Sequence, residues 1–304
     1  MGVYISKCLH YWVLVSGFLG ACQFSNTLPN FERNTPSARS VSPLPLPDTL
    51  FFAGEQIPLD NPLVKEALQE ALTVLGHRHA ATLLNLQKAG RWFPMIEEVL
   101  ANHKIPDDFK YLAVVESNLS NLTSRAGAVG FWQFMPETAK EYGLNLNEEV
   151  DERYDALKST QAAARYFRDA YLRFKNWNLA AASYNMGMKG LQRRLEEQKG
   201  TSYFELFLNP ETRQYLYYAA ATKCIFEKPA LYGYHLKEIE KLKPLPLRKI
   251  RVQQPIPDLA VFARQQGVTY FTLKTLNPWL RANRLRLISE TQPYEIALPR
   301  KEKI

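Results

Sequence analysis

The chain has 304 residues, of which 46% are hydrophobic and 22% charged. This composition is typical of a globular protein with a buried core, and the length allows one large domain or two smaller ones. The net charge of +8 is spread along the sequence, which indicates either an ordinary solvated surface or attraction to a polyanion such as a cell wall or an anionic membrane. No nucleic-acid-binding motif accompanies the charge, so a nucleic acid is excluded as the expected partner.

Residues 1–21 are predicted to be a signal peptide. Tyr11 to Ala21 form an apolar stretch that is too short to span a bilayer. Its end, Leu19-Gly-Ala-Cys22, resembles a bacterial lipobox, which implies cleavage before Cys22 and a lipid anchor on that cysteine. Because Gln23 follows rather than Asp, the resemblance implies an exported lipoprotein of the outer membrane that faces the periplasm. A signal peptide cut elsewhere is the alternative. Residues 1–6 also fit a myristoylation pattern, but the export signal directly downstream argues against it.

Residues 22–60 are predicted to be a tether. They are rich in Ser, Asn and Pro and include the alternating prolines of residues 43–47. Such a pattern favours an extended polyproline spacer, which would let a lipid-anchored domain reach away from the membrane. Featureless disorder is the alternative.

Residues 61–243 are predicted to form a nearly all-α domain. Asn61 followed by Pro62 is a helix start, because Asn is a good N-cap and Pro is favoured at the first helical position. No strand alternation is expected before about residue 248. Helices are expected at 62 to about 75, 93–102, 106–116, 136–142, 155–174, 179–185, 191–198 and 211–226, with stops at Gly90, Gly143, Gly187 and Gly200.

Glu116 is the candidate catalytic residue. It ends the apolar run 111–115, and no Asp or Glu follows between Ser117 and Pro136. A helix C-terminus and apolar surroundings both raise the pKa of a carboxyl, which is what a general acid working near neutral pH needs. By position alone, such a Glu more often marks the edge of a core. A lone carboxylate suggests sugar chemistry in which the substrate replaces the usual second carboxylate.

The loop that follows could contact a ligand. It combines glycines, which allow a close backbone approach, with Trp132, whose ring offers a face for a sugar, and Gln133, which can hydrogen-bond an acetamido or hydroxyl group. Core packing explains Phe131 and Met135 equally well, and for Phe134 it is the preferred interpretation.

Four short motifs in order carry a family resemblance. They are Glu116-Ser117, Gly130-Phe-Trp-Gln133, Ala182-Ser-Tyr-Asn185 and Glu211-Thr-Arg-Gln-Tyr215. Together they resemble the ES, GLMQ, AYN and ETRxY segments of the lytic transglycosylase family with its SLT-type catalytic domain. With the lead-in Pro106 to Leu112, the similarity is closest to the membrane-bound D-type murein transglycosylases and covers about residues 62–226.

The resemblance implies a lysozyme-like helical fold that cleaves the β-1,4 bond between N-acetylmuramic acid and N-acetylglucosamine in peptidoglycan. Glu116 would act as acid and then as base, and a 1,6-anhydro ring would form without water, a substrate-assisted exception to the two-carboxylate scheme. By the same resemblance, the substrate-binding residues are Ser124, Trp132, Gln133, Met135, Tyr184, Asn185 and Tyr215, and the supporting residues are Ser117, Glu211 and Arg213.

Residues 244–304 are predicted to be a separate small α/β module in the order strand, helix, helix, strand. The stretch Gly267-Val-Thr to Leu276-Asn-Pro resembles a LysM-type glycan-binding module, although the Gly-Asp-Thr entry of that family is absent. Packing against the helical domain and auxiliary glycan binding therefore both remain open.

Two other functions stay open beside the transglycosylase. A goose-type muramidase would hydrolyse the same bond, and a non-catalytic lipoprotein would only bind the wall. No cofactor is expected, and no metal site is expected because His77 and His79, two residues apart on a helix, do not share a face.

Overall fold

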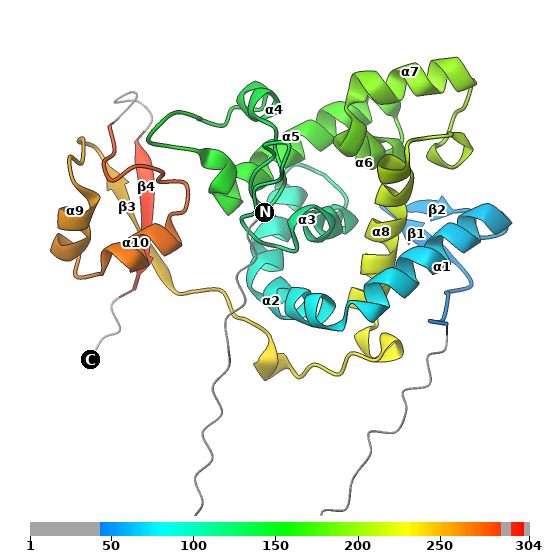
Figure 1. Ribbon diagram of the computed structural model, residues 1–304, viewed down its shortest axis with the longest axis horizontal. Helices are drawn as coiled ribbons and strands as arrows, with labels where there is room; N and C mark the ends of the chain where they lie inside the picture. The colour runs from blue at the N-terminus through cyan, green and yellow to red at the C-terminus, as the bar shows by residue number, and fades with distance from the viewer. Residues whose placement is uncertain (1–42, 287–292, 301–304) are drawn as a thin grey trace, which may run out of the picture. The chain divides into compact units, whose positions relative to one another are not determined.

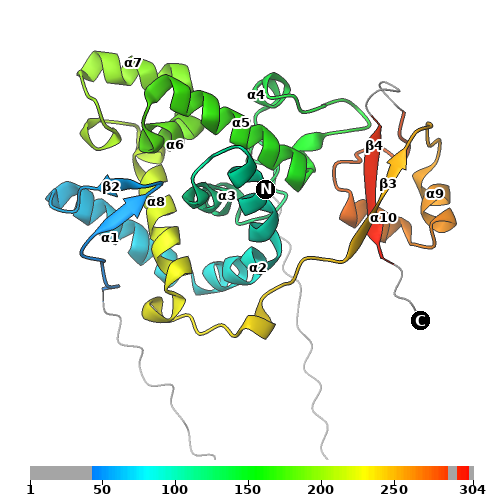
Figure 2. The same cartoon turned by 180° about the vertical axis from the view of Figure 1, so that it is seen from behind.

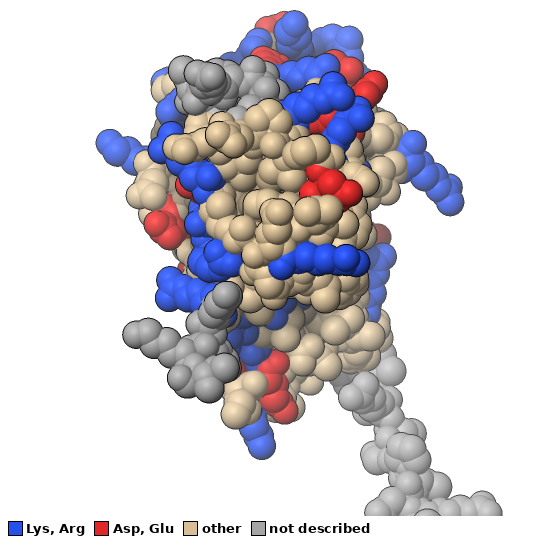
Figure 3. All heavy atoms as spheres, turned by 90° about the vertical axis from the view of Figure 1, so that its left-hand side faces the viewer, with Lys and Arg blue, Asp and Glu red and all other residues tan. Residues whose placement is uncertain are grey.

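In a computed structural model of the protein, residues 43–286 and 293–300 are described. Over these ranges the fold is mainly helical, with two small two-stranded sheets (Figures 1 and 2). This confirms the predicted fold class. The signal peptide and Cys22 lie outside the described residues, and no helix within the described ranges has the length and apolar character to cross a bilayer. On the face drawn in Figure 3, Lys and Arg side chains are scattered among uncharged residues rather than merged into one patch.

A β-hairpin precedes the first helix, where the sequence predicted only a tether. Strands β1 (Leu50–Phe52) and β2 (Glu55–Ile57) pair antiparallel around the turn at Ala53 and Gly54. Both turn residues have positive φ, 55° and 80°, as a tight two-residue hairpin turn requires. Leu50, Phe52 and Ile57 are buried. The prediction of a tether reaching residue 60 was therefore wrong for this part of the chain.

Helices build the main body of the protein. The N-cap prediction is confirmed at Asn61, whose Oδ1 accepts a 3.0 Å hydrogen bond from the backbone N–H of Leu63. Helix α8 packs against α1 and α3, and α5 packs against α2 and α6. The helices are α1 (Pro62–His77), α2 (His79–Asn102), α3 (Lys110–Ser117), α4 (Pro136–Glu141), α5 (Ala156–Phe174), α6 (Trp177–Met186), α7 (Met188–Gln198) and α8 (Pro210–Glu227).

Gly90 does not stop a helix, in contrast to the prediction. It lies inside α2, which begins at His79 rather than near Phe93. A Cβ atom at Gly90 would lie 2.8 Å from the carbonyl oxygen of Leu242, and the backbone N–H of Leu242 donates a 2.9 Å hydrogen bond to Gln87. Glycine is present because a distant segment crosses this helix at close range.

The C-terminal module has the predicted order of elements. Strands β3 (Leu247–Val252) and β4 (Tyr294–Pro299) pair antiparallel, with Leu247 opposite Pro299 and Val252 opposite Tyr294. Helices α9 (Leu259–Gln265) and α10 (Tyr270–Leu276) lie between them in sequence. The module has its own core, formed by Val252, Ile256, Leu259, Ala263, Leu273, Leu280, Leu285, Ile296 and Leu298, among others.

Candidate active site

Glu116 lies in the last turn of α3, as predicted. The helix ends because Asn118 adopts the left-handed conformation, with φ of 53°. The N–H of Asn118 donates a 2.8 Å hydrogen bond to the carbonyl of Val114. The Nδ2 of Asn85 on α2 donates a 2.8 Å hydrogen bond to Oδ1 of Asn118. A neighbouring helix therefore fixes the point at which α3 ends, and with it the direction of Glu116.

The residue Glu116 is partly exposed, but its carboxyl is largely surrounded by protein. Burial raises its pKa to about 7, and the negative charge of Glu211 acts in the same direction. The hydroxyl of Tyr215 donates a 2.6 Å hydrogen bond to Oε1 of Glu116 and opposes this rise. The predicted elevation of the pKa is confirmed, so a substantial fraction of Glu116 carries a proton at neutral pH.

Two tyrosines from separate motifs meet at Glu116. The charge of Glu116 contributes to raising the pKa of both Tyr184 and Tyr215, after burial as the main cause, so both side chains lie close to the carboxyl. The hydroxyl of Tyr184 donates a 2.7 Å hydrogen bond to the carbonyl of Trp132. The first, second, third and fourth motifs thus converge on one place.

Asn185 is held by the fourth motif. Its Oδ1 accepts a 2.6 Å hydrogen bond from the hydroxyl of Thr212, and its Nδ2 donates a 3.0 Å hydrogen bond to Oε1 of Glu211. Both ends of the amide are therefore oriented by α8. Thr212 is a site residue that sequence reasoning missed, although it lies inside the quoted ETR segment.

The loop of residues 118–135, called the substrate loop here, is braced by its own side chains. The buried Ser117 donates a 2.8 Å hydrogen bond to the carbonyl of Phe131, and its supporting role stays a prediction. The Oγ of Ser124 accepts a 2.9 Å bond from the N–H of Ala128. The Nε2 of Gln133 donates to the carbonyls of Leu122 and Gly130, at 3.1 and 2.8 Å.

Trp132 does not offer a face to a sugar, so that prediction was wrong. The side chain is fully buried, its Nε1 donates a 2.9 Å hydrogen bond to the hydroxyl of Thr160, and its ring packs edge-on against Phe167. Phe134 is also buried, as its packing interpretation predicted. Met135 is 40% exposed, so a ligand could reach it.

Arg213 is exposed on α8, and its supporting role stays a prediction. A cavity of about 760 Å³ lies elsewhere, and none of its lining residues belongs to the four motifs; they include Asp48, Glu55, Asp60, Asn178 and Glu205. Within the described part of the chain, no group of three or more His, Cys, Asp or Glu side chains is placed to hold a metal ion.

Comparison with known proteins gives two domain matches. The model of the transglycosylase SLT domain matches residues 94–207, which include α3, the substrate loop and α6. The model of the soluble lytic transglycosylase C-terminal LysM-like domain matches residues 248–302.

Individual relatives agree with these matches. The chain is 27% identical over 263 residues to "Membrane-bound lytic murein transglycosylase D" of Escherichia coli strains K12 and O6:H1, covering 84% of this chain and 56% of each relative. It is also 26% identical over 111 residues to the "Putative tributyltin chloride resistance protein" of Alteromonas sp. strain M-1, covering 35% of this chain and 54% of that protein. The chain thus spans little more than half the length of the curated relatives it matches. With the motifs and the fold in place, the chain is similar to proteins that carry a transglycosylase SLT domain and a LysM-like C-terminal domain, over residues 94–207 and 248–302.

Proposed function

We propose that this protein is a peptidoglycan lytic transglycosylase that cleaves the bond between N-acetylmuramic acid and N-acetylglucosamine without water. The observation that carries the proposal is the carboxyl of Glu116, with its pKa raised to about 7 and its hydrogen bond from Tyr215, inside a transglycosylase SLT domain. An acid whose pKa lies near the working pH is suited both to donate a proton and to take one back.

In the first step, protonated Glu116 gives its proton to the glycosidic oxygen as the bond to C1 of the muramic acid breaks. The acetamido oxygen of that sugar supports the positive charge at C1. The Glu116 carboxylate left behind keeps the hydrogen bond from Tyr215, which stabilises the charged form. Asn185 orients the acetamido group, because Thr212 and Glu211 hold its amide and one of its two Nδ2 hydrogens remains for the sugar.

In the second step, the C6 hydroxyl of the same sugar attacks C1 and the Glu116 carboxylate takes its proton. The product carries a 1,6-anhydro ring, and Glu116 is protonated again. Because the attacking hydroxyl belongs to the same sugar, the step is intramolecular and can exploit effective molarities of about 10⁵ M or more.

Hydrolysis by a goose-type muramidase mechanism is the second candidate, and one observation favours it. The exposed Glu211 is close enough to Glu116 to raise its pKa, so a second carboxylate lies nearby. In a hydrolase, such a group could activate a water molecule against C1. Release of a reducing muramic acid would distinguish this outcome from the anhydro ring.

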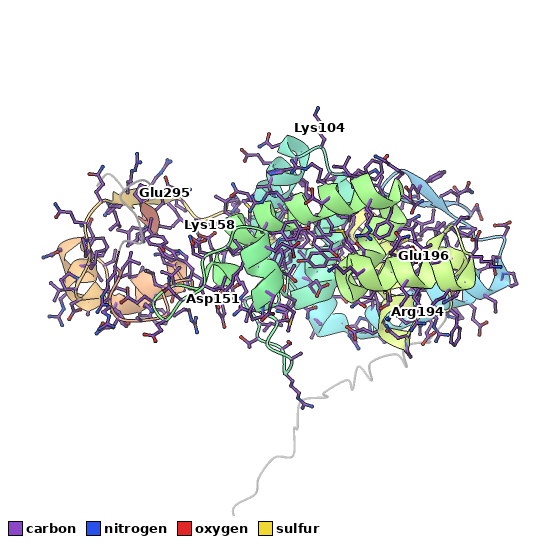
Figure 4. The ribbon with its side chains drawn as sticks, turned by 90° about the horizontal axis from the view of Figure 1, so that it is seen from above. Lys104, Asp151, Lys158, Arg194, Glu196 and Glu295 are labelled. Carbon is purple, nitrogen blue, oxygen red and sulfur yellow. The ribbon has the colours of Figure 1, made fainter. Side chains whose placement is uncertain are left out.

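The test is mass spectrometry of soluble fragments released from purified wall sacculi. Fragments with anhydro ends, each lighter by one water than hydrolytic ends, support the transglycosylase. Glu116→Gln is expected to abolish release while glycan binding survives, and Glu196→Gln, an exposed change on α7 (Figure 4), serves as the matched control. Reducing ends would establish the muramidase instead, and no fragments from the unaltered protein would leave a non-catalytic wall-binding lipoprotein.

We further propose that the protein works in the periplasm, attached to the outer membrane by lipid on Cys22. The lipobox-like sequence before Cys22 and the similarity to transglycosylases described as membrane-bound support this placement. Radiolabelled palmitate is expected to label the full chain in a bacterial host but not its Cys22→Ser variant. Equal labelling of both, or of neither, would contradict the anchor.

A further inference from the structure

Arg153 is a buried cation that donates hydrogen bonds to the backbone of the substrate loop. The residue is 8% exposed. Its Nη1 donates hydrogen bonds of 3.1 Å to the carbonyls of Gly127 and Phe134. These two carbonyls lie seven residues apart in the loop that carries Gln133, so a single guanidinium group ties the two ends of this segment together. Hydrogen bonds to a charged donor are stronger than neutral ones.

The backbone beside Arg153 also contacts the loop. A Cβ atom at Gly130 would lie 1.9 Å from the carbonyl oxygen of Arg153, so only glycine fits there. The Nδ2 of Asn121 donates a 3.0 Å hydrogen bond to the carbonyl of Tyr154, and the hydroxyls of Thr123 and Tyr154 lie 2.8 Å apart. The segment of residues 145–155, called the connecting loop here, therefore supports the substrate loop along much of its length.

Asp151 holds Arg153 in this position. Its Oδ1 accepts from Nε of Arg153 at 3.0 Å, and its Oδ2 accepts from Nη2 at 2.7 Å, a two-point ion pair in which both side chains are mostly buried. The N–H of Asp151 in turn donates a 2.9 Å hydrogen bond to the carbonyl of Trp279 in the C-terminal module, and Val150 forms a β-bridge with Leu280. The residue that orients Arg153 is thus itself bound to the module.

Glu149 makes the second contact between the connecting loop and the module. It is 9% exposed, and its carboxylate accepts a 2.7 Å hydrogen bond from Nε of Arg284 and another of 2.7 Å from the N–H of Arg286. Its carbonyl accepts from the N–H of Arg281 at 2.8 Å. A nearly buried carboxylate is costly unless it is fully paired, so its partners on the module keep this part of the connecting loop in place.

Lys158, at the start of α5, adds a third contact. It forms an ion pair with the buried Glu152 and lies over the rings of Tyr294 and Trp279, with Nζ 5.3 and 5.9 Å from their centroids. Figure 4 labels Lys158 and Asp151, which come from α5 and from the connecting loop.

We propose that Arg153 is a positioning residue for the substrate loop, and that the C-terminal module keeps Arg153 in place through its contacts with Glu149 and Asp151. The module then has a role in turnover that does not depend on binding glycan. The proposal rests on the proposed function only where it concerns turnover, because the order of the loop can be measured directly.

The test is hydrogen–deuterium exchange of the substrate loop in the full chain, with kcat and KM measured on wall sacculi. Arg153→Gln is expected to speed exchange of the amides in residues 122–135 by about tenfold, the effect of losing charge-assisted bonds to two carbonyls, and to lower kcat. Arg153→Lys, which keeps the charge but not the planar fork of donors, is expected to restore only part of the protection.

A matched pair tests the contribution of the module. Arg284→Gln removes the 50% exposed partner of Glu149, and Lys249→Gln removes a 54% exposed cation that pairs with Glu295 inside the module. Exchange in residues 122–135 should rise in the first variant and stay unchanged in the second. Equal exchange in both variants would overturn the coupling to the module.

The positioning role and the proposed function are refuted by different results. If Arg153→Gln folds with an unchanged melting temperature and unchanged loop exchange, the positioning role is wrong. If Arg153→Gln does not fold, the surface variant Arg284→Gln carries the test. Absence of wall fragments from the unaltered protein would refute the proposed function and leave the exchange result standing.

Discussion

The hydroxyl of Tyr215 lies 2.6 Å from Oε1 of Glu116 and donates to it across 99 positions of sequence. The fourth motif thereby stabilises the charged form of a carboxyl whose neutral form is favoured by burial and by the charge of Glu211. Two residues of the fourth motif, Tyr215 and Glu211, therefore act in opposite directions on the pKa of Glu116, and each effect can be tested by a substitution.

Removing the Tyr215 hydroxyl should shift the pH profile upward. Tyr215→Phe takes away the one effect that lowers the pKa of Glu116, so the carboxyl should stay protonated to a higher pH. If cleavage requires the protonated acid, the alkaline limb of kcat/KM should move up by about one unit, the value of a hydrogen bond to a charged group. Fragment release from sacculi between pH 5 and 9 measures this. Tyr218→Phe on the same helix is the control, and an unmoved limb in Tyr215→Phe would contradict the assignment.

Removing the charge of Glu211 should shift the same limb downward. Glu211→Gln abolishes the repulsion that helps to raise the pKa of Glu116. The same change weakens the acceptor of Asn185, so KM should rise as well. The measurement is the pH profile used for Tyr215→Phe, and the two variants should move in opposite directions. If Glu211→Gln instead abolishes cleavage at every pH, the hydrolytic candidate gains support.

Glu116→Gln should stabilise the fold, and more so at high pH. The pKa of Glu116 is raised from its ordinary value of 4.5 to about 7, so the folded state favours the protonated form. The contribution of Glu116 to stability is fully present below pH 4.5 and is lost as pH rises toward 7 and above. The charged carboxylate therefore costs up to about 3 kcal/mol above pH 8.

Melting temperatures at pH 5 and pH 8 test this prediction. The difference between Glu116→Gln and the unaltered protein should be small at pH 5 and larger at pH 8. An equal difference at both values would show that the carboxyl has an ordinary pKa.

Substitutions at Trp132 and Met135 should have different effects, the first on the stability of the fold and the second on substrate binding. Trp132→Ala empties a fully buried site and should cost about 3–5 kcal/mol of unfolding free energy. Met135→Ala, at a side chain 40% exposed, should leave the melting temperature nearly unchanged and raise KM. Denaturant unfolding and steady-state kinetics on both variants check this, and a Trp132→Phe variant that folds normally yet loses affinity would restore a binding role for the indole.

Local signals were enough to predict much of the helical body. The cap at Asn61 is a short-range feature, and its side chain accepts the expected backbone hydrogen bond. Glu116 could be placed at a helix end because an apolar run stops there and a polar, Gly-containing loop follows. Order and spacing of the motifs then identified the residues that meet around it, including Tyr184 and Tyr215.

The errors at Gly90 and Trp132 involve contacts between distant parts of the chain. Gly90 looked like a helix stop because its neighbour, the segment at Leu242, is distant in sequence. The indole of Trp132 looked available to a ligand because a loop has no periodicity to show which side chains are buried. In the fold, the hydroxyl of Thr160 on α5 accepts a hydrogen bond from the indole N–H. Likewise Arg153 has no local signal, since its two carbonyl partners lie in a loop that only the folded chain brings near.

The β1–β2 hairpin has a practical consequence for anyone who shortens this protein. The carboxylate of Asp108 accepts from the N–H of Ala53 and from Nζ of Lys223, both at 2.7 Å, and Lys223 also reaches the carbonyl of Phe51. A version that starts at Asn61 would lose the hydrogen bonds that Ala53 and Phe51 make with Asp108 and Lys223. Asp108 lies just before α3 in sequence. Leu44 and Leu46 also pack on the helical core. An N-terminal deletion should therefore leave everything from Pro43 onward intact.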